Sequence, residues 1–120
     1  MVKSQTNRKY DLEDRTLTFS CKLIGVCKSL AKNTINFNLI DQVVRSGTSL
    51  GANYREANET ETKKDFLYRI RICRKESKET IYWLKLLIEA NTTLTKDLTD
   101  LLSETQELLK IFSAIHENSK

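Results

Sequence analysis

The chain of 120 residues has no proline and only three glycines, and its 20 Lys and Arg residues against 16 Asp and Glu residues give a net charge of +4. This composition excludes β-sandwiches, Rossmann units and P-loops, because their tight turns and phosphate-binding loops need glycine or proline. No apolar run is long enough to cross a membrane and residues 1–10 lack the apolar segment of a signal peptide, so we expect a cytoplasmic protein of one domain.

The first two predicted helices follow from apolar residues spaced three and four apart, which places them on one face of a helix. Such a row predicts a helix over roughly residues 12–32, with Asp11 as its N-cap. Residues 33–38 are rich in asparagine and are predicted to be a connection. We expect Asn38 to cap a second helix that ends at Ala57.

The same spacing predicts two further helices. Thr62, with Asp65 three residues on, resembles a capping box and opens the longest helix of the chain. That helix runs to a break at Asn91-Thr92-Thr93, and Thr95 then opens a last helix.

Four amphipathic helices joined by short linkers predict an all-α fold, an antiparallel up-down-up-down four-helix bundle. We assign residues 1–10 to a flexible basic N-terminus, residues 11–117 to the bundle and residues 118–120 to a frayed C-terminus.

Charge is unevenly placed along the chain, since residues 63–88 carry eight basic and three acidic side chains and residues 89–120 carry three and six. On the third helix, basic and tyrosine side chains share a strip that faces away from the apolar row. We call these residues the basic strip: Lys64, Tyr68, Arg71, Arg74 at its edge, Lys75, Lys78, Tyr82 and Lys85. Cations neutralise phosphates and aromatic rings stack on unpaired bases, so the strip suits a nucleic acid. The alternative is a solvated face whose tyrosines lie at a subunit interface.

The second helix carries two glycines four residues apart, Gly47 and Gly51, although glycine inside a helix costs about 1 kcal/mol relative to alanine. Close approach of another helix explains them better than a phosphate loop does, because no Gly-Lys-Ser/Thr follows. A polar stripe on the same helix is either its solvated face or a hydrogen-bonded interface with a neighbouring helix or subunit. The stripe consists of Gln42, Arg45, Ser49, Asn53 and Glu56.

Few residues suit catalysis or metal binding. His116, the one histidine, lies in the last turn of the last helix, where we expect a C-terminal cap or a solvated side chain. Cys27 and Cys73 are predicted to be small core residues, and Cys21 is expected to be exposed. The odd cysteine count without a Cys-x-x-Cys pair favours neither disulfides nor zinc, and no Glu-x-x-His pair of the di-iron bundles is present. We therefore expect no enzyme, no metal and no cofactor.

The run from Gln42 to Ala57 closely resembles the signature helix of the small four-helix bundle proteins of the 23S rRNA intervening-sequence family. Further similarities lie in the third helix, at Lys63-Lys64-Asp65-Phe66, Glu76, Glu79 and Tyr82-Trp83-Leu84. The chain departs from many members at Asn53-Tyr54-Arg55-Glu56-Ala57, where they have Asn-Ile-Ala-Glu-Gly.

The resemblance implies a small bacterial cytoplasmic protein that assembles into a ring-shaped homopentamer. It also implies an association with RNA or DNA, with a ribosomal ribonucleoprotein or with a reverse transcriptase, and it points to no membrane and no small-molecule substrate. We therefore expect a non-enzymatic oligomer that binds nucleic acid through the basic strip. The alternative is an oligomeric protein scaffold or adaptor that does not contact nucleic acid.

Overall fold

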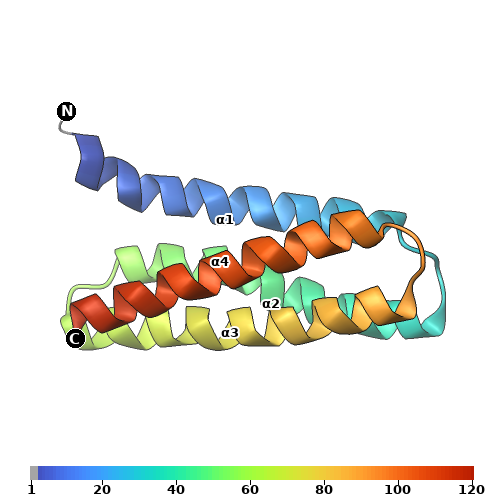
Figure 1. Cartoon of the computed structure of the whole chain (residues 1–120). Helices are drawn as coiled ribbons and strands as arrows, with labels where there is room; N and C mark the ends of the chain where they lie inside the picture. Colours follow the sequence, from blue (N-terminus) through green and yellow to red (C-terminus); the bar gives the residue numbers. More distant parts are fainter. Residues whose placement is uncertain (1–2) are drawn as a thin grey trace.

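The protein is built from four helices, as Figure 1 shows for the computed structural model, which describes residues 3–120 and, from residue 11 onward, their side chains. The helices are α1 (Lys3–Ser29), α2 (Thr34–Asn58), α3 (Lys63–Ala90) and α4 (Thr95–Ser119). The described residues contain no strand, which confirms the all-α prediction. None of these helices is apolar over enough of its length to span a membrane.

The helices pack at the four corners of a bundle, in the order α1, α2, α3, α4 and back to α1. The connections that precede α2 and α4 lie at one end of the bundle, and the connection between α2 and α3 lies at the other (Figure 1). The backbones of the two diagonal pairs, α1 with α3 and α2 with α4, do not approach one another within the described residues, although the rings of Tyr54 on α2 and Phe112 on α4 lie 6.1 Å apart between centroids across the core.

Two helix starts differ from the prediction. α1 begins at Lys3 and takes in residues up to Tyr10, where a flexible N-terminus is expected, so Asp11 lies inside the helix and is not its N-cap. α2 begins at Thr34, and its N-cap is Asn33 rather than Asn38, since the Asn33 side chain accepts a 2.8 Å hydrogen bond from the backbone N–H of Asn36. The predicted starts of α3 and α4 are confirmed, and Thr62 caps α3.

A buried amide pair explains why α2 starts so early. The Asn36 side chain is 1% exposed and donates to the Ala31 carbonyl at 2.8 Å. It also exchanges two 2.9 Å hydrogen bonds with the side chain of Asn91, which follows α3. Because a buried amide needs all these partners, the pair joins both connections at this end of the bundle and holds the first turn of α2 in the helix.

The core is a single apolar cluster to which every helix contributes, with Phe19, Leu23, Leu50, Ile70, Leu84, Leu98, Leu108 and Phe112 among its members. Cys27 and Cys73 belong to it, as predicted, and Cys21 is exposed. Burial raises the pKa of the Cys27 thiol to about 11 and that of Cys73 to about 12, so both are protonated and unreactive at neutral pH.

The two glycines of α2 lie directly under α1. The methyl carbon Cδ2 of Leu23 occupies the space that a Cβ atom at residue 47 would need. A Cβ at residue 51 would lie 2.9 Å from the Thr16 hydroxyl and 3.2 Å from the Thr16 Cβ atom. Thr16 cannot move easily, because its hydroxyl bonds the carbonyls of Leu12 and Glu13, both at 2.9 Å. Close approach by α1 is therefore what offsets the glycines' low helix propensity.

Gly51→Ala is expected to destabilise the protein by about 1–3 kcal/mol, because overpacking against Thr16 outweighs the gain in helix propensity. Gly25→Ala is the matched control: no atom lies within 4 Å of its added Cβ, so it should stabilise the protein by up to about 1 kcal/mol. Urea unfolding of the three proteins measures both effects, and a Gly51→Ala protein as stable as the parent would contradict the close approach.

Candidate nucleic-acid interface

The basic strip of α3 consists of two interleaved rows along the helix. Lys64, Arg71, Lys78 and Lys85 follow one another at intervals of seven residues, and so do Tyr68, Lys75 and Tyr82. Seven residues are nearly two turns of a helix, so each row stays on one face, the first over about 32 Å and the second over about 21 Å. All seven side chains are exposed.

The cations of these two rows have no carboxylate partner. Among the side chains of residues 11–120, no ion pair involves Lys64, Arg71, Lys75, Lys78 or Lys85. Two carboxylates of α3 are bound by another helix, since Arg45 of α2 pairs with Glu76 at 3.2 Å and with Glu79 at 2.6 Å. Among the side chains of residues 11–120, the cations of the strip are therefore held in no ion pair.

Two tyrosine rings lie among these cations. Tyr68 is 54% exposed and Tyr82 is 57% exposed. The Tyr82 ring meets the half-buried Trp83 ring edge-on, at 5.0 Å between centroids, and the Arg69 guanidinium lies 5.9 Å from the centroid of Tyr68. Because each ring rests against a neighbour and still faces solvent, it offers a flat surface on which a base can stack.

Arg74 differs from the rest of the strip. It is half-buried, and its Nε atom has no hydrogen-bond partner among the side chains of residues 11–120 or the described backbone. It lies near His116 of α4, which is 8% exposed and has both ring nitrogens unpartnered within the described residues, so the expectation of a solvated or capping histidine is wrong. Desolvation, followed by the charges of Arg74, Arg71 and Lys120, lowers the pKa of His116 below its ordinary value of 6.5. The histidine is therefore neutral at pH 7.

Part of the polar stripe of α2 is turned toward α3. Arg45 makes the ion pairs with Glu76 and Glu79, and the hydrogen bond to Glu79 raises the pKa of the Arg45 guanidinium above its ordinary value. The Asn53 side chain accepts a 3.0 Å hydrogen bond from Arg69.

The other stripe residues do not bond to α3 in the described part of the chain. Ser49 donates to the Ser46 carbonyl at 2.7 Å, within α2, whereas Gln42 and Glu56 are exposed.

Two buried hydroxyls outside that stripe add to the polar contacts between α2 and α3. We call the Arg45, Asn53 and Ser46 contacts with α3 the polar seam. A 2.9 Å hydrogen bond joins the Thr80 hydroxyl of α3 to the Ser46 hydroxyl, and both side chains are fully buried. The Thr80 hydroxyl also lies 2.8 Å from the Glu76 carbonyl of its own helix. Neither residue stands out in the sequence as a polar contact, because serine and threonine at core positions of a helix otherwise bond their own backbone. The seam fixes how α3 is rotated on α2 and therefore where the basic strip points.

The arrangement offers little for metal or covalent chemistry. Within residues 11–120, no three side chains of His, Cys, Asp and Glu come together as metal ligands would. The buried thiols are protonated, and His116 has no nucleophilic side chain as a hydrogen-bond partner. What the site can do chemically is attract an anion and stack against a flat ring.

Comparison with known proteins gives a family and a structural relative. The model of a family described as 23S rRNA-intervening sequence protein matches residues 8–114. A crystal structure of a protein of unknown function from the S23 ribosomal protein family of Bacteroides thetaiotaomicron is 32% identical in sequence. It superposes with a TM-score of 0.79 over 88% of this chain and 97% of that one. No curated protein matches the chain.

Arg45→Met is expected to lower the free energy of unfolding by about 1–2 kcal/mol, because it leaves the buried Glu76 carboxylate without its ionic partner. Arg55→Met is the matched control. Arg55 is equally exposed on the same helix but makes one longer ion pair, 3.4 Å to Glu13, so its loss should cost less than about 1 kcal/mol. Chemical unfolding distinguishes the two. Equal losses would mean that the Arg45 pair does not hold α3.

The stability of the protein should fall as pH drops below about 6.5, because His116 has a lower pKa when folded than when unfolded. In that window the unfolded chain binds more protons, so the free energy of unfolding rises with pH and is lost on acidification. His116→Leu should remove the contribution of the histidine to the pH dependence of the free energy of unfolding, and leave the contribution of the carboxylates unchanged. Urea unfolding at a series of pH values measures it, and parallel curves for the two proteins would contradict the burial of a neutral histidine.

Proposed function

The chain belongs to the 23S rRNA-intervening sequence protein family. From this membership and the surface of α3, we propose that the protein is a non-enzymatic, antiparallel up-down-up-down bundle. We propose that it binds nucleic acid, and RNA in the first place, through the basic strip of α3. The observation that carries the proposal is the row of exposed cations without ion pairs in residues 11–120. A protein–phosphate contact gains most where the cation has no competing carboxylate, since binding then only releases counterions from the nucleic acid.

The geometry of the strip favours backbone contacts over base-specific ones. Lysine and arginine on one helix face position a phosphate chain without reading its sequence, and the tyrosines stack on any exposed base. The RNA-binding face should therefore prefer single-stranded or looped segments to particular sequences. The partner that fits these contacts is an RNA, or a ribonucleoprotein, with accessible loops.

We further propose that the bundle works as a homo-oligomer, a ring-shaped homopentamer in the form implied by its family. Large apolar side chains remain exposed on α1 and α2: Leu17, Ile24, Ile35 and Phe37. Leu17 and Ile24 are seven residues apart and share a helix face. Exposed apolar side chains that share a face are typical of subunit contacts, and repeating the chain around a ring would multiply the basic strips. The same side chains favour the second candidate, a protein scaffold that does not bind nucleic acid.

The triple variant Arg71→Glu, Lys75→Glu and Lys78→Glu should abolish RNA binding and leave helicity and assembly intact, because these side chains are exposed and make no ion pair within residues 11–120. Fluorescence anisotropy against salt measures binding. Each lost phosphate contact lowers the slope of log affinity against log salt by about 0.7 for a single strand.

The matched control for this variant is Lys32→Glu, Lys96→Glu and Lys110→Glu, which changes the net charge equally at exposed positions outside α3. Binding should survive in the control. Unchanged binding in the α3 triple variant would refute the assignment of this face, and no binding by the parent at about 50 mM salt would favour the scaffold function.

Replacing the two exposed tyrosines tests the stacking contribution separately. Tyr68→Leu with Tyr82→Leu should weaken single-stranded RNA binding by about 1–3 kcal/mol per stacked base and leave duplex RNA binding nearly unchanged, because paired bases are not available to the rings. Parallel titrations with a single strand and its duplex give the comparison. Equal losses for both would show that the tyrosines do not stack on bases.

A further inference from the structure

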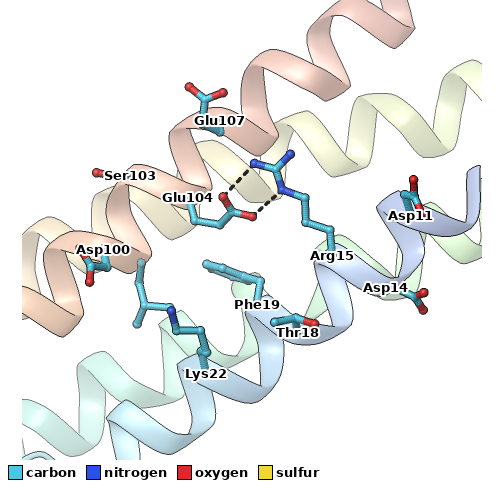
Figure 2. A pocket seen from close by; sticks show the side chains of 11 residues that line it. Asp11, Asp14, Arg15, Thr18, Phe19, Lys22, Asp100, Ser103, Glu104 and Glu107 are labelled. Atoms are coloured by element: carbon cyan, nitrogen blue, oxygen red, sulfur yellow. Dashed lines mark hydrogen bonds and ion pairs between the residues drawn. The ribbon is translucent and has the colours of Figure 1, made fainter. Parts of the chain in front are cut away.

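A groove of about 670 Å³ lies between α1 and α4, on a different side of the bundle from the basic strip. Figure 2 shows its walls, which are formed by α1 from Asp11 to Lys22 and by α4 from Asp100 to Glu107. The buried Phe19 and Leu101 side chains line its floor. Its volume is that of a ligand pocket and far exceeds the gaps of a well-packed helix interface.

The groove exists because α1 is held on its other side. The close approach at Gly47 and Gly51 fixes α1 against α2, and α4 packs mainly against α3. The contact between α1 and α4 is the sparsest of the four neighbouring pairs. In Figure 1, the ribbon of α1 diverges from that of α4 toward the N-terminal end of α1.

The charge of the groove is opposite to that of the protein as a whole. Five carboxylates line it, those of Asp11, Asp14, Asp100, Glu104 and Glu107, against the two cations Arg15 and Lys22. Phosphate groups are repelled by such a surface, so the groove is not a continuation of the nucleic-acid interface. A cationic ligand with an apolar part matches both the walls and the floor.

Three of the carboxylates are already paired, two of them weakly. Asp100 contacts Lys96 at 2.9 Å and Glu107 contacts Lys110 at 3.6 Å, each on its own helix and exposed to water, where such pairs contribute little. Asp11 and Asp14 make no ion pair within residues 11–120. A cation that binds at either end of the groove therefore breaks at most a weak, exposed ion pair.

The middle of the groove is occupied by an arginine of the chain itself. Arg15 reaches from α1 to Glu104 on α4 and makes two hydrogen bonds, 2.7 Å from Nε and 2.9 Å from a terminal nitrogen (Figure 2). This paired geometry is the strongest arrangement of a guanidinium and a carboxylate. Beside it lies the ring of Phe19, so the groove places a guanidinium site next to an apolar contact.

We propose that this groove binds an extended, arginine-bearing segment of a partner protein, in which one arginine replaces Arg15 on Glu104 and a neighbouring apolar side chain covers Phe19. The α1 wall measures about 16 Å, which four or five residues of an extended chain span. A whole helix, with a diameter of about 10–12 Å, does not fit a groove of this volume, so the occupant is not the α3 helix of a second copy. The binding of such a segment is independent of the proposed nucleic-acid function.

The test uses a short fluorescein-labelled peptide in which arginine and leucine alternate, titrated into the full-length protein at low salt. Glu104→Gln should lower the affinity about tenfold, because the guanidinium loses its charged acceptor. Arg15→Ala should raise it several-fold, because it frees Glu104 from its internal partner. Asp41→Asn, at an exposed carboxylate of α2 outside the groove, should have no effect.

Circular dichroism of each variant checks the fold, and a peptide of alternating glutamate and leucine checks the sign of the charge. Equal peptide affinity in the parent and Glu104→Gln would overturn the proposal, and so would an Arg15→Ala protein that binds no better than the parent. Analytical ultracentrifugation of the double variant Asp11→Lys and Glu107→Lys tests whether the groove is instead occupied by a second copy of the chain. A smaller assembly than the parent's would assign the groove to a second copy and overturn the proposal, whereas an unchanged assembly with lost peptide binding would support it.

Discussion

The close approach of α1 to α2 is the constraint on which the rest of the molecule depends. Leu23 fills the space that a side chain at residue 47 would need, and Thr16 lies against Gly51 with its hydroxyl held by its own helix. Two interior glycines are unfavourable for α2 in isolation, so only this packing makes them favourable. It also draws α1 toward one neighbour and leaves it loosely packed against the other, α4.

On its opposite flank, α2 holds α3 by polar contacts. The Arg45 ion pairs with Glu76 and Glu79 bind two carboxylates of α3, and the buried Ser46–Thr80 hydrogen bond forms only when α3 is rotated so that Thr80 faces α2. Buried polar contacts of this kind add little net stability, yet they penalise every misaligned packing. Arg45 and Ser46 of α2 therefore orient the face to which we assign nucleic-acid binding.

The modest net charge of +4 conceals two surfaces of opposite sign. The basic strip lies on the outward face of α3, whereas the acidic groove lies between α1 and α4, and the two surfaces share no residue. The two binding proposals therefore concern separate surfaces, one attractive to a polyanion and the other to a cationic segment. Charge on each face, rather than the sum over the chain, is the quantity that describes its recognition chemistry.

The sequence by itself determined the helices, the core face of each and the outward direction of the basic strip. Those features follow from a period of 3.6 residues, which is a local property of the chain. Only the tertiary structure decided the burial of His116, the partners of Arg45 and Asn53, the cap at Asn33 and the groove beside Arg15. Each of these depends on a side chain from a helix or connection distant in sequence, or on how closely two helices approach. Periodicity specifies which face of a helix is apolar, but not which helix that face meets or how tightly the two pack.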